Sequence, residues 1–292
     1  MKFPNPEMLL RIGQADAYAA ATEYIKLPRD QKVYDKALKF EGYVAHPTHK
    51  MSLGRYTDDT QMSIAVAEVL IQGPPFTPIV FANAFVDCFQ RDQRLGYSAS
   101  FQKFLVGVKT GQEFLDQIRP DSEKNGAAMR AVPIGILADP KQVLEVAATQ
   151  ASLTHNTPIG IFTAQSVALM SHYAMYCDEP FDVIVEYCSS HLPSFKFFIN
   201  EFSEPVSHPH ASLKTIHAVV QLLRTKDSLL DMLHQAIVWG GDTDSVAAIT
   251  WGIASARMKD TIPDFFEYTL EPGRKYGTEY LKELGQKLME VV

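Results

Sequence analysis

Cysteine is scarce in this chain of 292 residues, which carries only Cys88, Cys177 and Cys188. Their number is odd, and none of them lies in a C-x-x-C pair. This pattern argues against a disulfide framework and against a zinc site built on thiolates. We expect three free thiols in a reducing compartment.

Long apolar runs are also missing. No window reaches the roughly 18 uninterrupted apolar residues that a membrane-spanning helix needs. The N-terminal sequence MKFPNP lacks the apolar core of a signal peptide. We therefore expect a cytoplasmic protein that does not enter a membrane.

Positive charge is limited as well. The formal net charge is -7, and no stretch is strongly basic. A basic nucleic-acid-binding face is therefore not expected. An acidic protein that binds an anionic ligand needs a positive partner, and bound metal ions are the obvious source of that charge.

The chain has no feature that would divide it into domains. It contains no Gly/Ser linker, low-complexity tract, charge block or internal repeat. Hydrophobic residues make up 46% and charged residues 21%, which is ordinary for a globular protein with a large core. We expect residues 1–292 to form one domain.

Helical periodicity is the main pattern that is present. Between 60 and 71, the residues Met62, Ala65, Val66 and Val69 recur at the spacing of one helix face, and Gly73 follows. The same spacing covers 8–25, 78–90, 141–151, 159–176, 180–190, 212–224, 228–238, 245–257 and 276–291. Strict alternation is nearly absent, so we predict an all-α fold. Loops are expected near 42–56, 93–98, 118–126 and 203–210.

An acidic pair precedes the helix expected at 60–71, in the sequence Thr57-Asp58-Asp59-Thr60. Threonine and aspartate are common N-cap residues, so a capped helix is one interpretation. Capping does not explain two adjacent carboxylates. They repel each other, and one would hold a proton unless a cation neutralises the pair.

A second acidic motif, Gly240-Gly241-Asp242-Thr243-Asp244-Ser245, precedes the helix expected at 245–257. The glycine pair allows a tight turn close to a ligand. Two aspartates and a hydroxyl on a short arc suit Mg²⁺ or Mn²⁺ and do not suit zinc. An Asp-rich turn that caps a helix is the alternative interpretation.

The two motifs together predict a site for two divalent cations, Mg²⁺ or Mn²⁺, with room for water and substrate. The candidate metal ligands are Thr57, Asp58, Asp59, Asp242, Asp244 and Ser245.

These motifs resemble those of the ADP-ribosylglycohydrolase family. The resemblance extends to the spacing of Asp16 and Glu23, to Ser-Glu-Lys-Asn-Gly-Ala-Ala-Met-Arg at 122–130, and to Leu-Thr-His at 153–155. The motifs follow the family order over nearly the whole chain. Alanines stand at 15 and 19, where the family has glycine. Glu123 and Lys124 occupy positions that are often an aromatic residue and a glycine.

The resemblance implies a single compact all-α domain of the ADP-ribosylglycohydrolase type, with a central two-metal cleft. It makes Glu23 the candidate catalytic residue, as a general base or proton donor. It assigns contacts with ADP-ribose to Gly96, Tyr97, Ser122, Glu123, Lys124, Asn125, Gly126, Ala127, Met129 and His155.

The function implied is metal-dependent hydrolysis of the N- or O-glycosidic bond between ADP-ribose and a modified target, with a protein as the expected target and a monomer as the expected state. A two-metal nucleotide phosphohydrolase is one alternative, although the Glu-x-x-Glu pattern at 201–204 is isolated and no histidine precedes an aspartate. A non-catalytic relative that binds ADP-ribose is the other, although all six candidate metal ligands are present.

Overall fold

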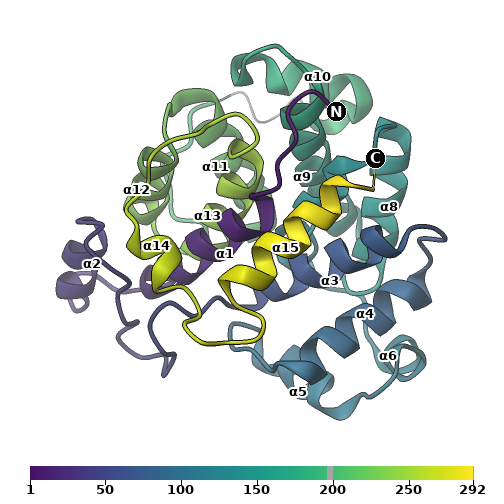
Figure 1. Cartoon of the computed structure of the whole chain (residues 1–292), viewed down its shortest axis with the longest axis horizontal. Coiled ribbons are helices and arrows are strands. Elements are labelled where there is room, and N and C mark those ends of the chain that lie inside the picture. Colours follow the sequence, from purple (N-terminus) through teal and green to yellow (C-terminus); the bar gives the residue numbers. More distant parts are fainter. Residues whose placement is uncertain (196–199, 292) are drawn as a thin grey trace.

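The computed structural model describes residues 1–195 and 200–291. Within these ranges the regular elements are helices, and strand pairing is limited to two isolated bridges, Asp121 with His155 and Val206 with Gly241. The predicted all-α fold is confirmed (Figure 1). No helix in the described residues is long and apolar enough to cross a bilayer.

The α-helices are α1 (Met8–Ala19), α2 (Gln31–Ala37), α3 (Asp58–Gln72), α4 (Pro78–Arg91), α5 (Ala99–Gly107), α6 (Gly111–Gln117), α7 (Gly126–Met129), α8 (Pro140–Ser152), α9 (Pro158–Tyr176), α10 (Ile184–His191), α11 (Ala211–Thr225), α12 (Leu229–Trp239), α13 (Thr243–Ala254), α14 (Phe265–Tyr268) and α15 (Thr278–Met289). The 3₁₀ turns η1 (Ala20–Thr22), η2 (Val132–Ile136) and η3 (Phe181–Val183) lie between them.

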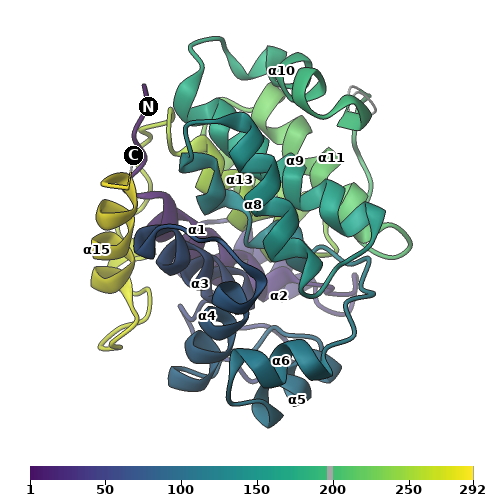
Figure 2. The ribbon, with the colours of Figure 1, turned by 90° about the vertical axis from the view of Figure 1, so that its right-hand side faces the viewer.

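The centre of the fold is the packing of α1 against α13 (Figures 1 and 2). Every residue of α13 is buried, because its sequence is apolar or small on all sides. A Cβ atom on Gly252 would lie 2.6 Å from Cγ1 of Ile12, so only glycine permits this approach. The two helices therefore bring the N-terminal and C-terminal acidic motifs to the same region.

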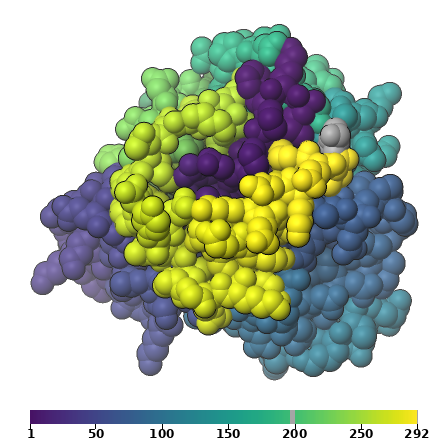
Figure 3. Space-filling view, in the orientation of Figure 1, coloured from purple at the N-terminus to yellow at the C-terminus, as the bar shows by residue number. Residues whose placement is uncertain are grey.

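The two ends of the chain close one face of the molecule. Figure 3 shows the N-terminal segment beside the last helix, α15. The main-chain N–H of Asn5 donates to Sδ of Met289 at 3.2 Å, and α15 packs on α1 and α3. The helices that carry the acidic motifs are thus held from both termini.

Helices α3 and α13 each begin two residues earlier than expected, at Asp58 and Thr243. At α3 the Thr57 side chain accepts the N–H of Asp59 as an N-cap. Both acidic motifs therefore extend into first helical turns, where the helix dipole favours negative charge. The helix expected over 8–25 ends at Ala19 instead, and Glu23 follows η1 with φ -59° and ψ 120°.

The short helices α2, α5, α6, α7 and α14 were not expected from periodicity. They have seven, nine, seven, four and four residues, which is too short for a helical repeat to stand out. Residues 181–185, which fitted a helix as well as a strand, lie in η3 and the start of α10.

Candidate metal centre and ligand cavity

A cavity of about 900 Å³ opens where the two acidic motifs meet. The predicted site residues that line it are Glu23, Asp58, Asp59, Gly96, Tyr97, Ser122, Lys124, Asn125, Gly126, Met129, His155, Asp242, Asp244 and Ser245. Residues far apart in the sequence thus surround one space large enough for a nucleotide-sized ligand.

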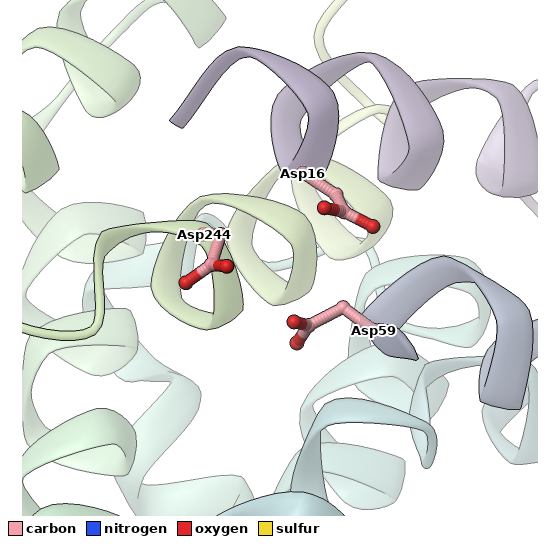
Figure 4. A group of neighbouring side chains, drawn as sticks. All are labelled: Asp16, Asp59 and Asp244. Atoms are coloured by element: carbon pink, nitrogen blue, oxygen red, sulfur yellow. The ribbon is translucent and has the colours of Figure 1, made fainter. Parts of the chain in front are cut away.

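The carboxylates converge from three helices. Oxygen atoms of Asp16, Asp59 and Asp244 lie within 4.8 Å of one another, and so do those of Glu23, Asp242 and Asp244. Figure 4 shows Asp16 on α1, Asp59 at the start of α3 and Asp244 at the start of α13, close together between these three helices. Asp244 belongs to both groups and links them.

Asp16 is already saturated by hydrogen bonds. Its carboxylate accepts the main-chain N–H of Thr57 at 2.9 Å and that of Thr60 at 3.1 Å. It also accepts the hydroxyls of Thr57 at 2.9 Å and Thr60 at 2.5 Å. These bonds oppose the rise that burial causes in the pKa of Asp16, which reaches about 6. Asp16 therefore caps α3 across the fold and is not available as a metal ligand.

Asp59 and Asp244, in contrast to Asp16, are buried with few partners in the protein. Both are 3% exposed, and no ion pair in the described residues involves either of them. Oδ1 of Asp59 is buried without a hydrogen-bond partner. Burial, followed by the repulsion of neighbouring carboxylates, raises the pKa of each well above its usual range.

Buried carboxylates without a cationic partner suit divalent cations. The side chains near Asp59 and Asp244 include other carboxylates and the hydroxyl of Ser245. The hydrogen bond from Ser245 to Asp59 partly offsets the rise in the pKa of Asp59. Hard oxygen ligands of this kind suit Mg²⁺ or Mn²⁺. A bound cation would also neutralise charges that the protein itself leaves unpaired.

Asp58 and Glu23 are half-buried and face the cavity. Burial raises the pKa of Asp58 to about 8, and the nearby Asp16 adds to the shift. Burial and then Asp242 raise the pKa of Glu23 to about 8. Either carboxyl can therefore hold a proton near neutral pH when no cation is bound.

Asp242 is oriented by two donors. The hydroxyl of Tyr24 and the amide of Asn125 both donate to its Oδ2, each at 3.2 Å. The N–H of Tyr24 donates to the carbonyl of Gly241 at 2.8 Å, which ties the segment after Glu23 to the second acidic motif. Gly241 has φ +82°, and a Cβ there would lie 2.2 Å from the carbonyl oxygen of Val206. The glycine is therefore required for this turn.

Gly96 packs directly on the first acidic motif. A Cβ at this position, with φ +109°, would lie 2.0 Å from Oδ1 of Asp58. The next residue, Tyr97, is buried and donates its hydroxyl to Gln61 at 2.8 Å. The loop thus touches α3 through its backbone, and any larger residue at position 96 would displace Asp58.

A buried ion pair connects the loop that contains Gly96 to the segment before Thr57. Arg94 and Glu271 pair at 1% and 0% side-chain exposure, and the same Glu271 oxygen accepts the N–H of Tyr56 at 3.0 Å. The Arg94 guanidinium lies 3.7 Å from the centre of the Tyr56 ring. The segment before Thr57 and the loop with Gly96 are therefore fixed to each other.

Three predicted residues do not line the cavity. The Thr57 hydroxyl bonds to Asp16 behind Asp59, and Thr57 is 2% exposed. Ala127 is fully buried, and its carbonyl accepts from Gln150 at 3.0 Å. Glu123 is exposed, and its carbonyl accepts from Ser212 at 2.7 Å. A role for Thr57 as a metal ligand stays a prediction.

Several residues at the site were not assigned a role from the sequence. Phe101 and Phe104 of α5 line the cavity and pack on Phe114 beneath it. Asp16 lies inside a motif that the sequence does show, so its spacing to Glu23 was the available signal. The i, i+3 spacing of Phe101 and Phe104 indicates only a helix face, which carries no signal for a ligand.

The sequence model of the ADP-ribosylglycohydrolase family matches residues 12–292. The chain belongs to this family. It is 26% identical to an uncharacterised protein of Archaeoglobus fulgidus, over 99% of this chain and 96% of that protein. It is 25% identical to the ADP-ribosylhydrolase ARH3 of Xenopus tropicalis, over 81% of each chain. It is 23% identical to the ADP-ribosylarginine hydrolase Tri1 of Pseudomonas putida, over 85% of this chain and 68% of that protein.

The fold is also similar to a solved structure described as an ADP-ribosylglycohydrolase-related protein complex. The TM-score is 0.72 at 18% sequence identity, covering 98% of this chain and 96% of the other. This similarity confirms that the fold is that of the family.

Proposed function

We propose that this protein is a divalent-metal-dependent hydrolase that releases ADP-ribose from a modified target. The observation that carries the proposal is the pair of buried carboxylates Asp59 and Asp244, which have no ion-pair partner in the described residues and lie at the wall of a cavity of about 900 Å³. Membership of the ADP-ribosylglycohydrolase family and relatives named as ADP-ribosylhydrolases support the same activity.

The carboxylates at the helix N-termini would hold the cations, Mg²⁺ or Mn²⁺. We assign this role to Asp58, Asp59, Asp242, Asp244 and Ser245, with Thr57 behind them. Bound there, the cations would supply positive charge for the ribose hydroxyls and would lower the pKa of a water molecule in the site.

Glu23 is the proposed proton carrier. Its carboxyl faces the cavity, and the rise of its pKa to about 8 lets it hold a proton at neutral pH. It would give that proton to the nitrogen or oxygen that leaves C1″ of the ribose, while a water oxygen bonds to C1″. The same carboxylate can then take a proton back from the added water.

The remaining walls suit the rest of the nucleotide. Phe101 and Phe104 offer aromatic faces for a purine ring. Lys124 and Arg119 line the same cavity, and no ion pair in the described residues involves either of them. They would offset the negative charge of a diphosphate in an acidic protein.

The test is a hydrolysis panel with arginine-, serine- and DNA-linked ADP-ribose, in Mg²⁺, in Mn²⁺ and in chelator. Free ADP-ribose should appear only with metal, and the substrate that is cleaved identifies the acceptor. Release of AMP or phosphate instead would identify a phosphohydrolase, and binding without release would identify a non-catalytic relative. Full activity of Asp244→Ala in chelator would overturn the proposal.

Asp231→Asn is the matched control for Asp244→Asn. Both aspartates lie in the first turn of a helix, but Asp231 is exposed on α12 and does not line the cavity. Only the Asp244 variant should lose metal-dependent turnover.

A further inference from the structure

His155 has one ring nitrogen that is buried without a partner. The residue is 6% exposed and lines the cavity, and its Nε2 makes no hydrogen bond within the described part of the chain. A Cβ on Gly126 would lie 3.3 Å from this nitrogen, so Nε2 lies against the loop at 125–126. Buried polar atoms are nearly always paired, so this nitrogen indicates a bond that a ligand completes.

The contacts of the other ring nitrogen, Nδ1, determine whether Nε2 donates or accepts that hydrogen bond. Nδ1 of His155 lies 2.7 Å from Oγ1 of Thr154. The same hydroxyl oxygen accepts Nη2–H of Arg130 at 2.8 Å. Arginine can only donate, so the single hydroxyl proton of Thr154 is left to point at Nδ1. The ring proton is then on Nε2, which is a donor toward the cavity.

The other tautomer, with the proton on Nδ1, is less favourable. If Nδ1–H donated to Oγ1, the hydroxyl proton of Thr154 would need another acceptor, and none is found in the described residues. Thr154 is 5% exposed, so a lost hydroxyl bond would carry the full cost of desolvation.

Arg130 is itself held firmly. Its Nε donates to the side chain of Gln150 at 2.6 Å, and Nη2 donates to the Gln150 carbonyl at 3.1 Å. The guanidinium lies 4.4 Å from the centre of the Phe85 ring and is 1% exposed. Burial, and then the charges of Arg130 and Lys124, lower the pKa of His155 to about 3, so the ring is neutral at physiological pH.

We propose that Arg130 and Thr154 are positioning residues that hold His155 as the neutral Nε2–H tautomer, so that this part of the cavity recognises a ligand oxygen that accepts a hydrogen bond. The oxygen belongs to a phosphate or to a ribose. The assignment of this oxygen to ADP-ribose rests on the proposed function. The assignment of the His155 tautomer does not depend on that function.

The first test needs no variant and no ligand. In protein labelled with ¹⁵N-histidine, long-range ¹H–¹⁵N spectra distinguish the two neutral tautomers, and His155→Gln assigns the signals. We expect protonated Nε2 and unprotonated Nδ1 at neutral pH. Protonated Nδ1 in the wild-type protein would overturn the proposal. His172 is an internal reference, because it is a buried histidine outside the cavity whose Nε2 lies 3.3 Å from the Ala138 carbonyl.

The second test separates positioning from packing. Thr154→Val removes the hydroxyl at nearly constant volume, and Thr154→Ser keeps it. The valine variant should shift His155 toward the Nδ1–H tautomer and raise the Kd for ADP-ribose about tenfold, the size of one hydrogen bond. The serine variant should restore both, and Arg130→Gln should act in the same direction as valine. An unchanged tautomer and Kd in Thr154→Val would contradict the proposal.

Ligand titrations identify the oxygen. A shift of the His155 Nε2 signal with ADP but not with ribose marks a phosphate oxygen, and a shift with ribose marks the sugar. If the wild-type protein bound no ADP-ribose at all, the proposed function would fail, and the tautomer of the free protein would still decide this proposal.

Discussion

The carboxylate of Asp16 accepts both the main-chain N–H and the hydroxyl of Thr57, each at 2.9 Å. A side chain on α1 thus caps the helix that presents Asp58 and Asp59. Carboxylates that look alike in the sequence therefore have different roles. Asp16 holds the helix in place, and its neighbours remain free for a cation.

Asp16→Asn should weaken both the fold and the metal site. An amide keeps one acceptor but sets its own N–H against the donors of Thr57 and Thr60, so we expect a loss of about 1–3 kcal/mol in the free energy of unfolding. Urea unfolding measures this loss, and calorimetric titration should show weaker Mg²⁺ binding. Asp139→Asn is the control, since asparagine caps α8 as well as aspartate does. An Asp16 variant with wild-type Mg²⁺ affinity would refute the positioning role.

The metal-free protein should become less stable as pH rises from about 5 to about 8. The pKa of Asp16 is raised to about 6, and those of Asp58 and Glu23 to about 8. In an unfolded chain these carboxyls have pKa values of roughly 4, so the folded state binds more protons over this range. Stability is therefore greatest below the unfolded values and is lost as pH rises through the folded values.

Mg²⁺ should reverse this loss, because it replaces the protons on the same carboxylates. Thermal unfolding in chelator and in saturating Mg²⁺ measures the effect, and the difference between the two should grow with pH. A midpoint in chelator that stays level or rises over this range would show that the carboxylates are not strained by their shared burial.

Glu23→Gln should separate binding from catalysis. The change keeps the shape of the side chain but removes the proton that Glu23 would carry, so kcat should fall by about 10²–10⁴. The Kd for ADP-ribose should stay within about threefold, because the amide still fits the same space. Glu41→Gln is a surface control. A Glu23→Gln variant with near-normal kcat would remove Glu23 from the mechanism.

His46 should be needed to place Glu23. Its Nδ1 accepts the N–H groups of Thr48 at 3.1 Å and His49 at 2.9 Å, so Nε2–H is left to donate to the Glu23 carbonyl at 2.9 Å. Glutamine can present an N–H near the Nε2 position, and asparagine is too short. We expect kcat to fall about tenfold in His46→Asn and much less in His46→Gln, at similar KM. Equal kcat values in the two variants would contradict this role.

Much of this arrangement was accessible from the sequence. Helical spacing and the lack of alternation predicted an all-α fold, because these patterns are local. The two acidic motifs were identified as site residues from residue type and spacing, whereas Glu23 and His155 were identified through the resemblance to the family. The structure brings all of them to one cavity. The first residue of α3 was predicted wrongly, because capping by Thr57 draws Asp58 and Asp59 into the helix. Helix α13 also begins two residues earlier than predicted, at Thr243.

Only the tertiary structure distinguished the carboxylates from one another. Asp16 and Asp59 are both acidic residues beside a helix end, yet one accepts four hydrogen bonds from α3 and the other keeps a buried oxygen unpaired. Those bonds join residues 41 and 44 positions apart, and the relay from Arg130 to His155 crosses 24 positions at its first step. The sequence determined which chemical groups are present and their order. The packing of α1 on α13 and α3 decided which of those groups are satisfied by the protein and which are left for a ligand.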